Sequence, residues 1–224
     1  MGAVTMHTFL FSDLAGFTAL TEAHGDESAA ELAQAFCREV GDLVPVGRGE
    51  LVKQIGDAAM VRLDDARDAM RLGLGVVYDI GGRHGLPAIR VGLHTGTGVE
   101  RDGDWFGAAV NIAARVAGQA IGCEVLLSEE TRVAAGEQRE FQLYPRGRTA
   151  MRNVGEPVLL HTARRRGEMT TGGLEIDPVC RMAVDRSRAA GVLSHEARDY
   201  LFCSLGCAQA FAGAPERYAQ GTAA

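Results

Sequence analysis

The feature that most restricts the fold of this chain is an apolar run that ends at a carboxylate and then opens a helix. The segment TFLFSDLAGFT (8–18) begins with strand-like apolar residues, reaches Asp13, and passes through Gly16 into residues with helical spacing. Backbone N–H groups at a helix N-terminus favour anions. The sequence therefore predicts a strand–loop–helix unit in which Asp13 and the loop residues Gly16, Phe17 and Thr18 suit a cation with bound phosphate groups.

The rest of the first 163 residues alternates strands and helices. A Gly56–Asp57 turn joins two apolar-rich runs into a predicted hairpin over 49–63. We expect further strands over 6–12, 87–99, 124–128, 139–144 and 150–163, and helices over 15–40, 64–80, 107–120 and from Ser128, a suitable N-cap. This order predicts an α+β fold, in which helices partly cover a sheet.

Charge and apolar patterning exclude several classes of function. The net charge is −6, so the chain is not expected to bind nucleic acid through a basic surface. No apolar run approaches the roughly 20 residues that cross a bilayer, so we expect no membrane span. The N-terminus lacks a basic segment followed by an apolar one, so we also expect no signal peptide. Five cysteines, an odd number, fit a reducing compartment, and we expect a cytoplasmic protein.

The cysteines divide the chain into two units, because three of the five crowd the last quarter: Cys180, Cys203 and Cys207. The stretch RRRGEMTTGG (164–173) is charged, then rich in small residues, and predicts a linker over 164–174 between a first domain (1–163) and a tail. The tail, 175–219, is too short for a large core. We expect a metal ion or docking onto the first domain to help it fold.

Two acidic residues lie at structural break points of the first domain. Asp13 ends the first strand, and Asp57 lies at the tip of the hairpin. If these strands are neighbours in the sheet, both carboxylates face one pocket. Carboxylate and phosphate oxygens are the ligands that Mg²⁺ or Mn²⁺ prefers, so a catalytic metal site is one interpretation. The plainer interpretation is that Asp13 caps a helix and Asp57 forms a turn.

Four further polar residues are candidates for substrate binding. Lys53 precedes Asp57 by four residues on the hairpin, and Asp104 lies beside the only tryptophan. Asn111 and Arg115 are spaced i,i+4, so they share one face of a helix otherwise rich in Ala and Val. An arginine can stabilise charge on a transferring phosphoryl group. The alternative is that all four are ordinary solvated residues.

Four separated segments, taken in order and spacing, resemble the class III nucleotidyl cyclase catalytic domain: FLFSDLAGFT, LVKQIGDAAMVRL, IRVGLHTGTG and DWFGAAVNIAARV. The resemblance covers about residues 5–163. It implies a fold derived from the ferredoxin-like arrangement, with a mostly antiparallel central sheet and helices. It also implies formation of a cyclic nucleotide by two-metal-ion catalysis, which agrees with the lack of a Ser/His or Cys/His nucleophile pair.

The resemblance implies a metal site and a base-reading pair. Asp13 and Asp57 would bind two Mg²⁺ or Mn²⁺ ions, with the Leu14 carbonyl assisting. Lys53 and Asp104 would select the purine. This pair resembles the adenine-reading version, so ATP is the expected substrate and cyclic AMP the expected product.

The remaining family positions concern the ribose and the phosphates. Asn111 would orient the ribose, and Arg115 would steady the pentavalent phosphorus. Relatives often have a lysine within LKG that approaches the triphosphate; this chain has MRNVGEP there, so Arg152 is the candidate replacement. The family shares each site between two catalytic domains, one supplying the aspartates and the other these groups. A head-to-tail homodimer with two equivalent sites is therefore expected.

The three C-terminal cysteines have the spacing C-x22-C-x3-C, which puts two thiols on one face of a helix. With His195, which lies eight residues before Cys203, they form a candidate site for Zn²⁺ or Cu⁺. The alternative is buried structural thiols. The elements DPVC, FCSLGC and F…P..Y resemble the YHS domain, a small TRASH-like α+β metal-binding module, over 175–219. Relatives usually have Gly where this chain has Arg181.

Three hypotheses remain from the sequence. The first is an adenylate cyclase whose rate is tuned by the C-terminal module. The second is a metal-binding or sensor protein that uses an inactive or weakly active cyclase scaffold. The third is a guanylate cyclase, against which Lys53 and Asp104 argue.

Overall fold

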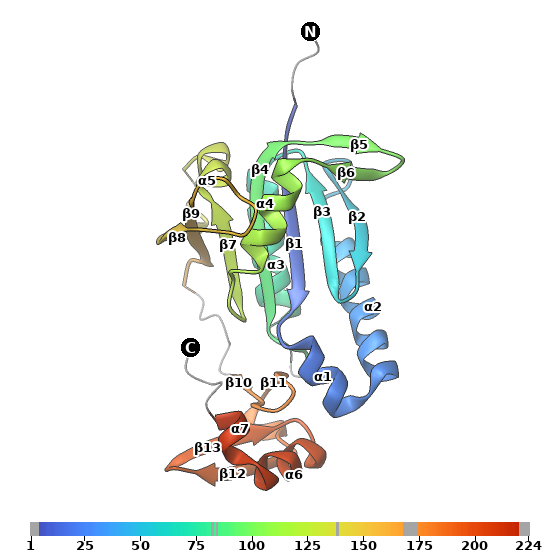
Figure 1. Cartoon of the computed structure of the whole chain (residues 1–224), viewed down its shortest axis with the longest axis vertical. Helices are drawn as coiled ribbons and strands as arrows, with labels where there is room; N and C mark the ends of the chain where they lie inside the picture. The colour runs from blue at the N-terminus through green and yellow to red at the C-terminus, as the bar shows by residue number, and fades with distance from the viewer. Residues whose placement is uncertain (1–4, 82, 84, 138, 168–173, 220–224) are drawn as a thin grey trace.

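The structure of the chain is a computed structural model that describes residues 5–81, 83, 85–137, 139–167 and 174–219 (Figure 1). The first part contains, in order, β1 (Met6–Leu14), α1 (Phe17–His24), α2 (Asp26–Leu43), β2 (Gly49–Ile55), β3 (Ala58–Leu63), α3 (Ala66–Gly75), the π-helical turn η1 (Val76–Ile80), β4 (Ile89–Thr97), β5 (Val99–Arg101), β6 (Asp104–Phe106), α4 (Ala108–Ala117), β7 (Glu124–Ser128), α5 (Glu129–Ala135), β8 (Phe141–Thr149) and β9 (Val158–Arg165). The C-terminal part contains β10 (Glu175–Ile176), β11 (Ala183–Val184), the 3₁₀ turn η2 (Arg186–Arg188), β12 (Gly191–His195), β13 (Arg198–Phe202), α6 (Leu205–Gly213) and α7 (Pro215–Ala219).

A seven-stranded sheet organises the first part, with the strand order β2-β3-β1-β4-β7-β9-β8. All neighbouring strands are antiparallel except β4 and β7, which are parallel. The first four strands and their helical crossovers form a β-α-β-β-α-β unit of the ferredoxin-like kind. The predicted α+β fold with a mostly antiparallel sheet is confirmed.

Helices cover the two faces of the sheet unequally (Figure 1). One face carries the large core of the domain, in which Leu10, Val61 and Val91 pack with residues of α2 and α3. On the other face, α4 packs against β1 and β4 over a smaller cluster that includes Phe11 and Met60. Residues opposite one another in a sheet, or two apart along a strand, share a face.

Several element boundaries differ from the prediction. The helix expected over 15–40 is two helices, because Gly25 takes a left-handed φ of 84° between α1 and α2. The final strand continues beyond Ala163 to Arg165, whose guanidinium hydrogen-bonds to Asp79. The first domain therefore uses residues assigned to the linker. Residues 168–173 of that linker lie outside the described part.

The C-terminal part is a small module that lies beside α1, at the end of the sheet where β1 finishes (Figure 1). Its own core combines aromatic residues with two thiols: Val179, Cys180, Tyr200, Phe202, Cys207 and Phe211. The module contacts the first domain through backbone hydrogen bonds. Ala183 donates to the Leu86 carbonyl at 2.7 Å, and the Gly85 and Ala88 N–H groups donate to the carbonyls of Ala183 and Arg181. Segment 181–183 therefore pairs with segment 85–88, directly before β4.

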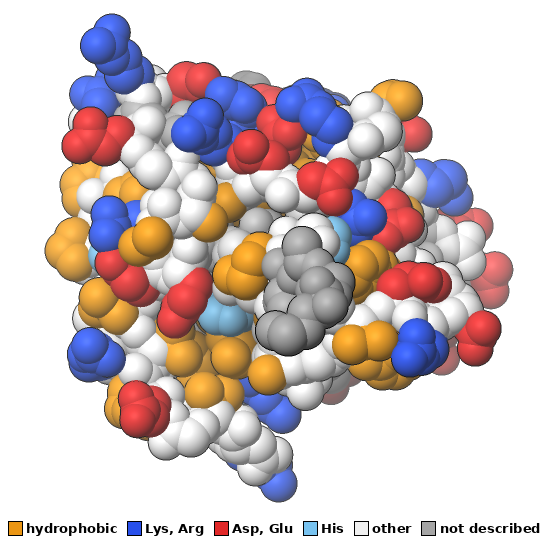
Figure 2. Space-filling view, turned by 90° about the horizontal axis from the view of Figure 1, so that it is seen from above, with side chains coloured by type: hydrophobic (Ala, Val, Ile, Leu, Met, Phe, Trp, Pro, Cys, Tyr) orange, Lys and Arg blue, Asp and Glu red, His pale blue; other side chains and the backbone are white. Residues whose placement is uncertain are grey.

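Charged side chains of both signs are interspersed on the face at the β5–β6 end of the molecule (Figure 2). That face shows no broad basic stripe among the side chains drawn, in keeping with the acidic net charge. Within the described ranges, every helix is too short or too polar to cross a lipid bilayer.

Candidate functional site

Asp13 and Asp57 meet at one end of the sheet. The strands β1 and β3 are neighbours with Ser12 opposite Ala59, so the end of β1 lies beside the turn that carries Asp57. The Leu14 backbone N–H is near enough to the Asp57 carboxylate to oppose the rise in its pKa, so the two segments lie close together. This geometry satisfies the condition set from the sequence, that the two strands be neighbours.

The carboxylates of Asp13 and Asp57 are close enough for their charges to repel one another. Asp13 lies on the face that α4 covers, because it is two residues from Phe11. Arg90, opposite Asp13 on β4, donates two hydrogen bonds to its carboxylate at 2.7 and 2.8 Å. Burial, and then the nearby charge of Asp13, raise the pKa of Asp57. A divalent cation between the two carboxylates would offset their mutual repulsion, and carboxylate oxygens are the ligands that a hard divalent ion prefers.

The loop after Asp13 is shaped by glycine and covered by the module. Gly16 has a φ of 82° and precedes α1, whose first residue, Phe17, packs against the core while Thr18 is exposed. The side chain of Arg181 lies so close to Gly16 that an added Cβ would be 2.4 Å from its Cγ. The loop therefore has no room for a larger residue while the module is docked.

Lys53 and Asp104 form the predicted pair. The Lys53 ammonium donates to the Asp104 carboxylate at 2.5 Å, and this hydrogen bond lowers the pKa of Asp104. Lys53 lies opposite Met60, so it shares the α4 face of the sheet with Asp13. Its ammonium also lies 6.0 Å from the centre of the exposed Phe106 ring. The pair is thus half-exposed and open to a ligand.

Asn111 and Arg115 are both exposed on the outer surface of α4. The helix is held close to the sheet because Gly92 allows it: an added Cβ there would be 2.0 Å from the Ala117 nitrogen. Buried Ala113 and Val116 face the sheet, so the polar pair points away from it. Arg152 is exposed in the connection between β8 and β9. No contact among the described residues joins Arg152 to the aspartates.

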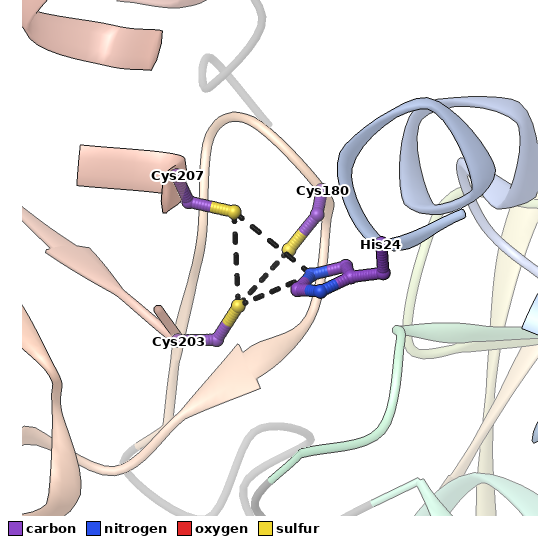
Figure 3. A group of neighbouring side chains, drawn as sticks. All are labelled: His24, Cys180, Cys203 and Cys207. Atoms are coloured by element: carbon purple, nitrogen blue, oxygen red, sulfur yellow. Dashed lines mark hydrogen bonds between the residues drawn. The ribbon is translucent and has the colours of Figure 1, made fainter. Parts of the chain in front are cut away.

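The three C-terminal cysteines come together, but the histidine beside them is not the predicted one. The Sγ atoms of Cys180 and Cys203 are 3.3 Å apart, and those of Cys203 and Cys207 are 3.8 Å apart. His24, the last residue of α1, completes the group (Figure 3). His195 lies instead on β12, with its ring edge-on to Phe211 at 6.0 Å between ring centres. The assignment of His195 to this cluster is therefore corrected to His24.

Sequence reasoning missed two residues of these sites, Arg90 and His24. Arg90 stands within the quoted segment IRVGLHTGTG, and its signal was a charged residue on an otherwise apolar strand next to the carboxylate-bearing strand. His24 carries no local signal, because its partners lie more than 150 residues later. Only the docking of the module onto α1 reveals it.

Comparisons with known proteins place the two parts in different families. Residues 2–171 match the family described as Adenylate and Guanylate cyclase catalytic domain, and residues 176–222 match the YHS domain. The chain is 34% identical over 171 residues to a pH-sensitive adenylate cyclase of Mycobacterium tuberculosis. This match covers 74% of this chain and 42% of the relative. It is 41% identical over 106 residues to an adenylate cyclase of Streptomyces coelicolor, and this match covers 47% of this chain and 28% of the relative.

The chain thus spans less than half the length of these curated relatives. Among solved structures, the adenylyl cyclase CyaB from P. aeruginosa superposes with a TM-score of 0.60 at 23% identity. The superposition covers 73% of this chain and 97% of that one. At this level of identity the likeness shows a shared fold.

Proposed function

Because the chain belongs to the adenylate and guanylate cyclase catalytic domain family and continues into a YHS domain, we propose that it is an adenylate cyclase. The reaction would convert ATP into 3′,5′-cyclic AMP and pyrophosphate. The ribose 3′-hydroxyl loses its proton to solvent, and its oxygen forms a bond to the α-phosphorus as the bond from that phosphorus to pyrophosphate breaks. The observation that carries this proposal is the meeting of Asp13 and Asp57 beside Arg90, on the face of the sheet that also presents Lys53.

Each candidate site residue has a role in the proposed reaction. Asp13, Asp57 and the Leu14 carbonyl would hold Mg²⁺ or Mn²⁺, which when bound supplies Lewis acidity to the 3′-hydroxyl and the phosphates. Gly16, Phe17 and Thr18 offer backbone N–H groups to the phosphates at the start of α1. Arg90 balances Asp13 in the structure and provides a cation next to the same oxygens.

Lys53 and Asp104 would read the adenine. A lysine ammonium suits the ring nitrogen acceptors of adenine, and a carboxylate suits its exocyclic amino group. Their hydrogen bond holds both side chains in place before the base arrives. A guanylate cyclase is the alternative, and it would need a donor for the guanine oxygen where Asp104 offers only acceptor atoms.

The proposed active form is a head-to-tail homodimer. Asn111 and Arg115 point outward from α4, where the aspartates of their own chain do not lie. The surface around Lys53 exposes apolar side chains, with Ile55 49% and Phe106 53% accessible. A second copy laid on this surface would bury them and bring its Asp13 and Asp57 toward Asn111 and Arg115. Each of the two sites would then combine both chains, with Arg152 as a further contact to the triphosphate.

The test is product formation by purified protein with ATP or GTP in the presence of Mn²⁺. We expect cyclic AMP from ATP, and a loss of roughly 10²-fold or more in the Asp57→Ala and Arg115→Ala variants. Mixing the two inactive variants should restore activity, because one of the two mixed sites keeps all its residues. Cyclic GMP as the main product would contradict the base assignment, and a mixture that stays inactive would contradict the shared site.

We also propose that the C-terminal module binds a thiophilic metal ion, Zn²⁺ or Cu⁺, and tunes the cyclase rate. The contact of Arg181 with Gly16 supports this proposal, because the module lies directly on the loop that follows Asp13. With Mn²⁺ kept at saturation, removing Zn²⁺ or Cu⁺ with a chelator selective for thiophilic ions should change the rate of the wild-type chain. The Cys180→Ser variant is the matched control, in which chelation should have no effect.

A further inference from the structure

The cysteine cluster is closed by a residue of the catalytic domain, which makes it a contact between domains. The Nε2 atom of His24 lies 3.6 Å from the Cys203 Sγ and 3.9 Å from the Cys207 Sγ. Figure 3 shows the imidazole entering the group of three sulfur atoms from the α1 side. All four ligand atoms lie within 4.8 Å of one another. Four ligands around tetrahedral Zn²⁺ are separated by about 3.5–3.8 Å, so the set is close to metal-ligand spacing.

The surroundings hold these side chains in position. The buried Asp177 carboxylate accepts hydrogen bonds from the backbone N–H groups of Val179, Cys180 and Cys203. Ser204 caps α6 and accepts from the Cys207 N–H, which places that thiol in the first turn of the helix. A helix N-terminus favours a thiolate, the form that binds metal. The cluster is thus supported by outer hydrogen bonds, as metal sites are.

Part of the interface between α1 and the module is not filled by side chains. A cavity of about 430 Å³ lies between α1 and the module, lined in part by Ala19, Ala23 and Ala210. Glu22 and Arg217 approach only to 3.8 Å, and both are exposed, so this ion pair contributes little. Apart from backbone pairing with segment 85–88, the four-residue cluster is the strongest candidate to fix the module against α1.

We propose that His24, Cys180, Cys203 and Cys207 form one interdomain Zn²⁺ site that fastens the module to helix α1. All four tetrahedral positions are then filled by protein, which is typical of a structural site. Since α1 starts at the loop after Asp13, the ion sets how firmly Arg181 and its neighbours press on that loop. This inference deepens the proposed metal regulation and rests on it only for the effect on rate.

The test uses the reduced, metal-free chain of 224 residues, which is titrated with Co²⁺, and the bound Co²⁺ is then displaced by Zn²⁺. Wild type should bind one equivalent of Co²⁺ with the visible bands of a tetrahedral site that contains thiolate ligands. His24→Ala should lower Zn²⁺ affinity about 100-fold, because one of four ligands is lost. His24→Cys should restore tight binding with a shifted spectrum, which a merely structural role of His24 would not explain. His195→Ala is the matched control and should bind as wild type.

A second measurement tests whether Zn²⁺ holds the module against α1. Zn²⁺ should slow amide hydrogen exchange in α1 and in 85–88 of the wild-type chain, and should do so much less in His24→Ala. Equal Zn²⁺ affinity in His24→Ala and wild type would overturn the interdomain site, as would formation of a Cys180–Cys203 disulfide in place of metal binding. If His24→Ala bound Zn²⁺ as wild type and chelation still altered the cyclase rate, the proposed regulation would be supported without a role for His24. If His24→Ala lost Zn²⁺ affinity but chelation did not change the cyclase rate of wild type, the Zn²⁺ site would be supported and the regulation contradicted.

Discussion

At the residue scale, the closeness of Asp13 to Asp57 could be predicted from the sequence, and the position of His24 beside the cysteines could not. Asp13 and Asp57 interrupt apolar runs at a strand end and a turn, positions where a carboxylate has a limited set of purposes. His24 sits in a polar helical stretch and resembles any exposed residue. Its partners belong to another domain, and contact across domains leaves no local spacing to detect.

The burial of His94 predicts that the stability of the fold depends on pH. Burial lowers its pKa below the ordinary value of 6.5, although Glu130 opposes the shift, and its Nδ1 is hydrogen-bonded to the Ser128 hydroxyl at 2.7 Å. The unfolded chain then binds a proton that the folded chain resists. This contribution to stability is complete above about pH 6.5 and is lost as the pH falls below it.

We expect His94→Asn, which keeps a polar atom near the Nδ1 position, to reduce the loss of melting temperature between pH 7.5 and 5.5. His7 also has a lowered pKa, through burial and Arg62, and should account for part of the remaining slope. Thermal melts of both proteins at several pH values would measure this. An unchanged slope in the variant would show that His94 is not the responsible group.

At the element scale, the existence of strands and helices followed from periodicity, whereas their ends depended on tertiary contacts. The break at Gly25 divides a stretch whose apolar spacing continues across it. The packing of α4 on the sheet depends on Gly92, because its missing side chain admits the backbone of Ala117. The helix α4, which carries Asn111 and Arg115, is therefore positioned by Gly92 on β4.

Gly92→Ala should force α4 away from β4. We expect a loss of about 1–3 kcal/mol in the free energy of unfolding, the usual cost of overpacking. Activity should fall as well, because Arg115 moves with the helix. Gly118→Ala, at the end of the same helix, is the control: an added Cβ there is 3.5 Å from the nearest atom, and its φ of −67° suits alanine. Denaturant unfolding of the two variants should separate them clearly.

At the scale of the whole molecule, the sequence indicated two units but placed their boundary inside a strand. The strand β9 pairs Arg165 with Phe141 on β8, and Arg166 donates to the Glu140 and Arg139 carbonyls. A charged run such as RRR resembles a linker in composition, because arginines at the end of a strand and arginines in a linker both extend into solvent. Only the pairing partner distinguishes them.

A catalytic domain that ends at Ala163 should consequently be less stable than one that ends at Gly167. The shorter chain loses the Arg165–Asp79 ion pair and the last pairings of β9. We expect its melting temperature to be lower by at least about 2–4 °C, which corresponds to about 1 kcal/mol in a domain of this size. Equal melting temperatures would show that the last residues of β9 contribute nothing to folding.

The docking of segment 181–183 on segment 85–88 has a consequence for how such a protein can evolve. Its hydrogen bonds join backbone groups, and Ala88 also accepts from the Ala15 N–H in the loop after Asp13. These groups do not depend on the chemistry of the side chains, although the φ of 86° at Gly85 favours glycine there, and proline at 85, 88 or 183 would remove a donor. Lineages could therefore exchange or lose individual cysteine ligands, and with them the ion, while inheriting the same attachment of tail to enzyme.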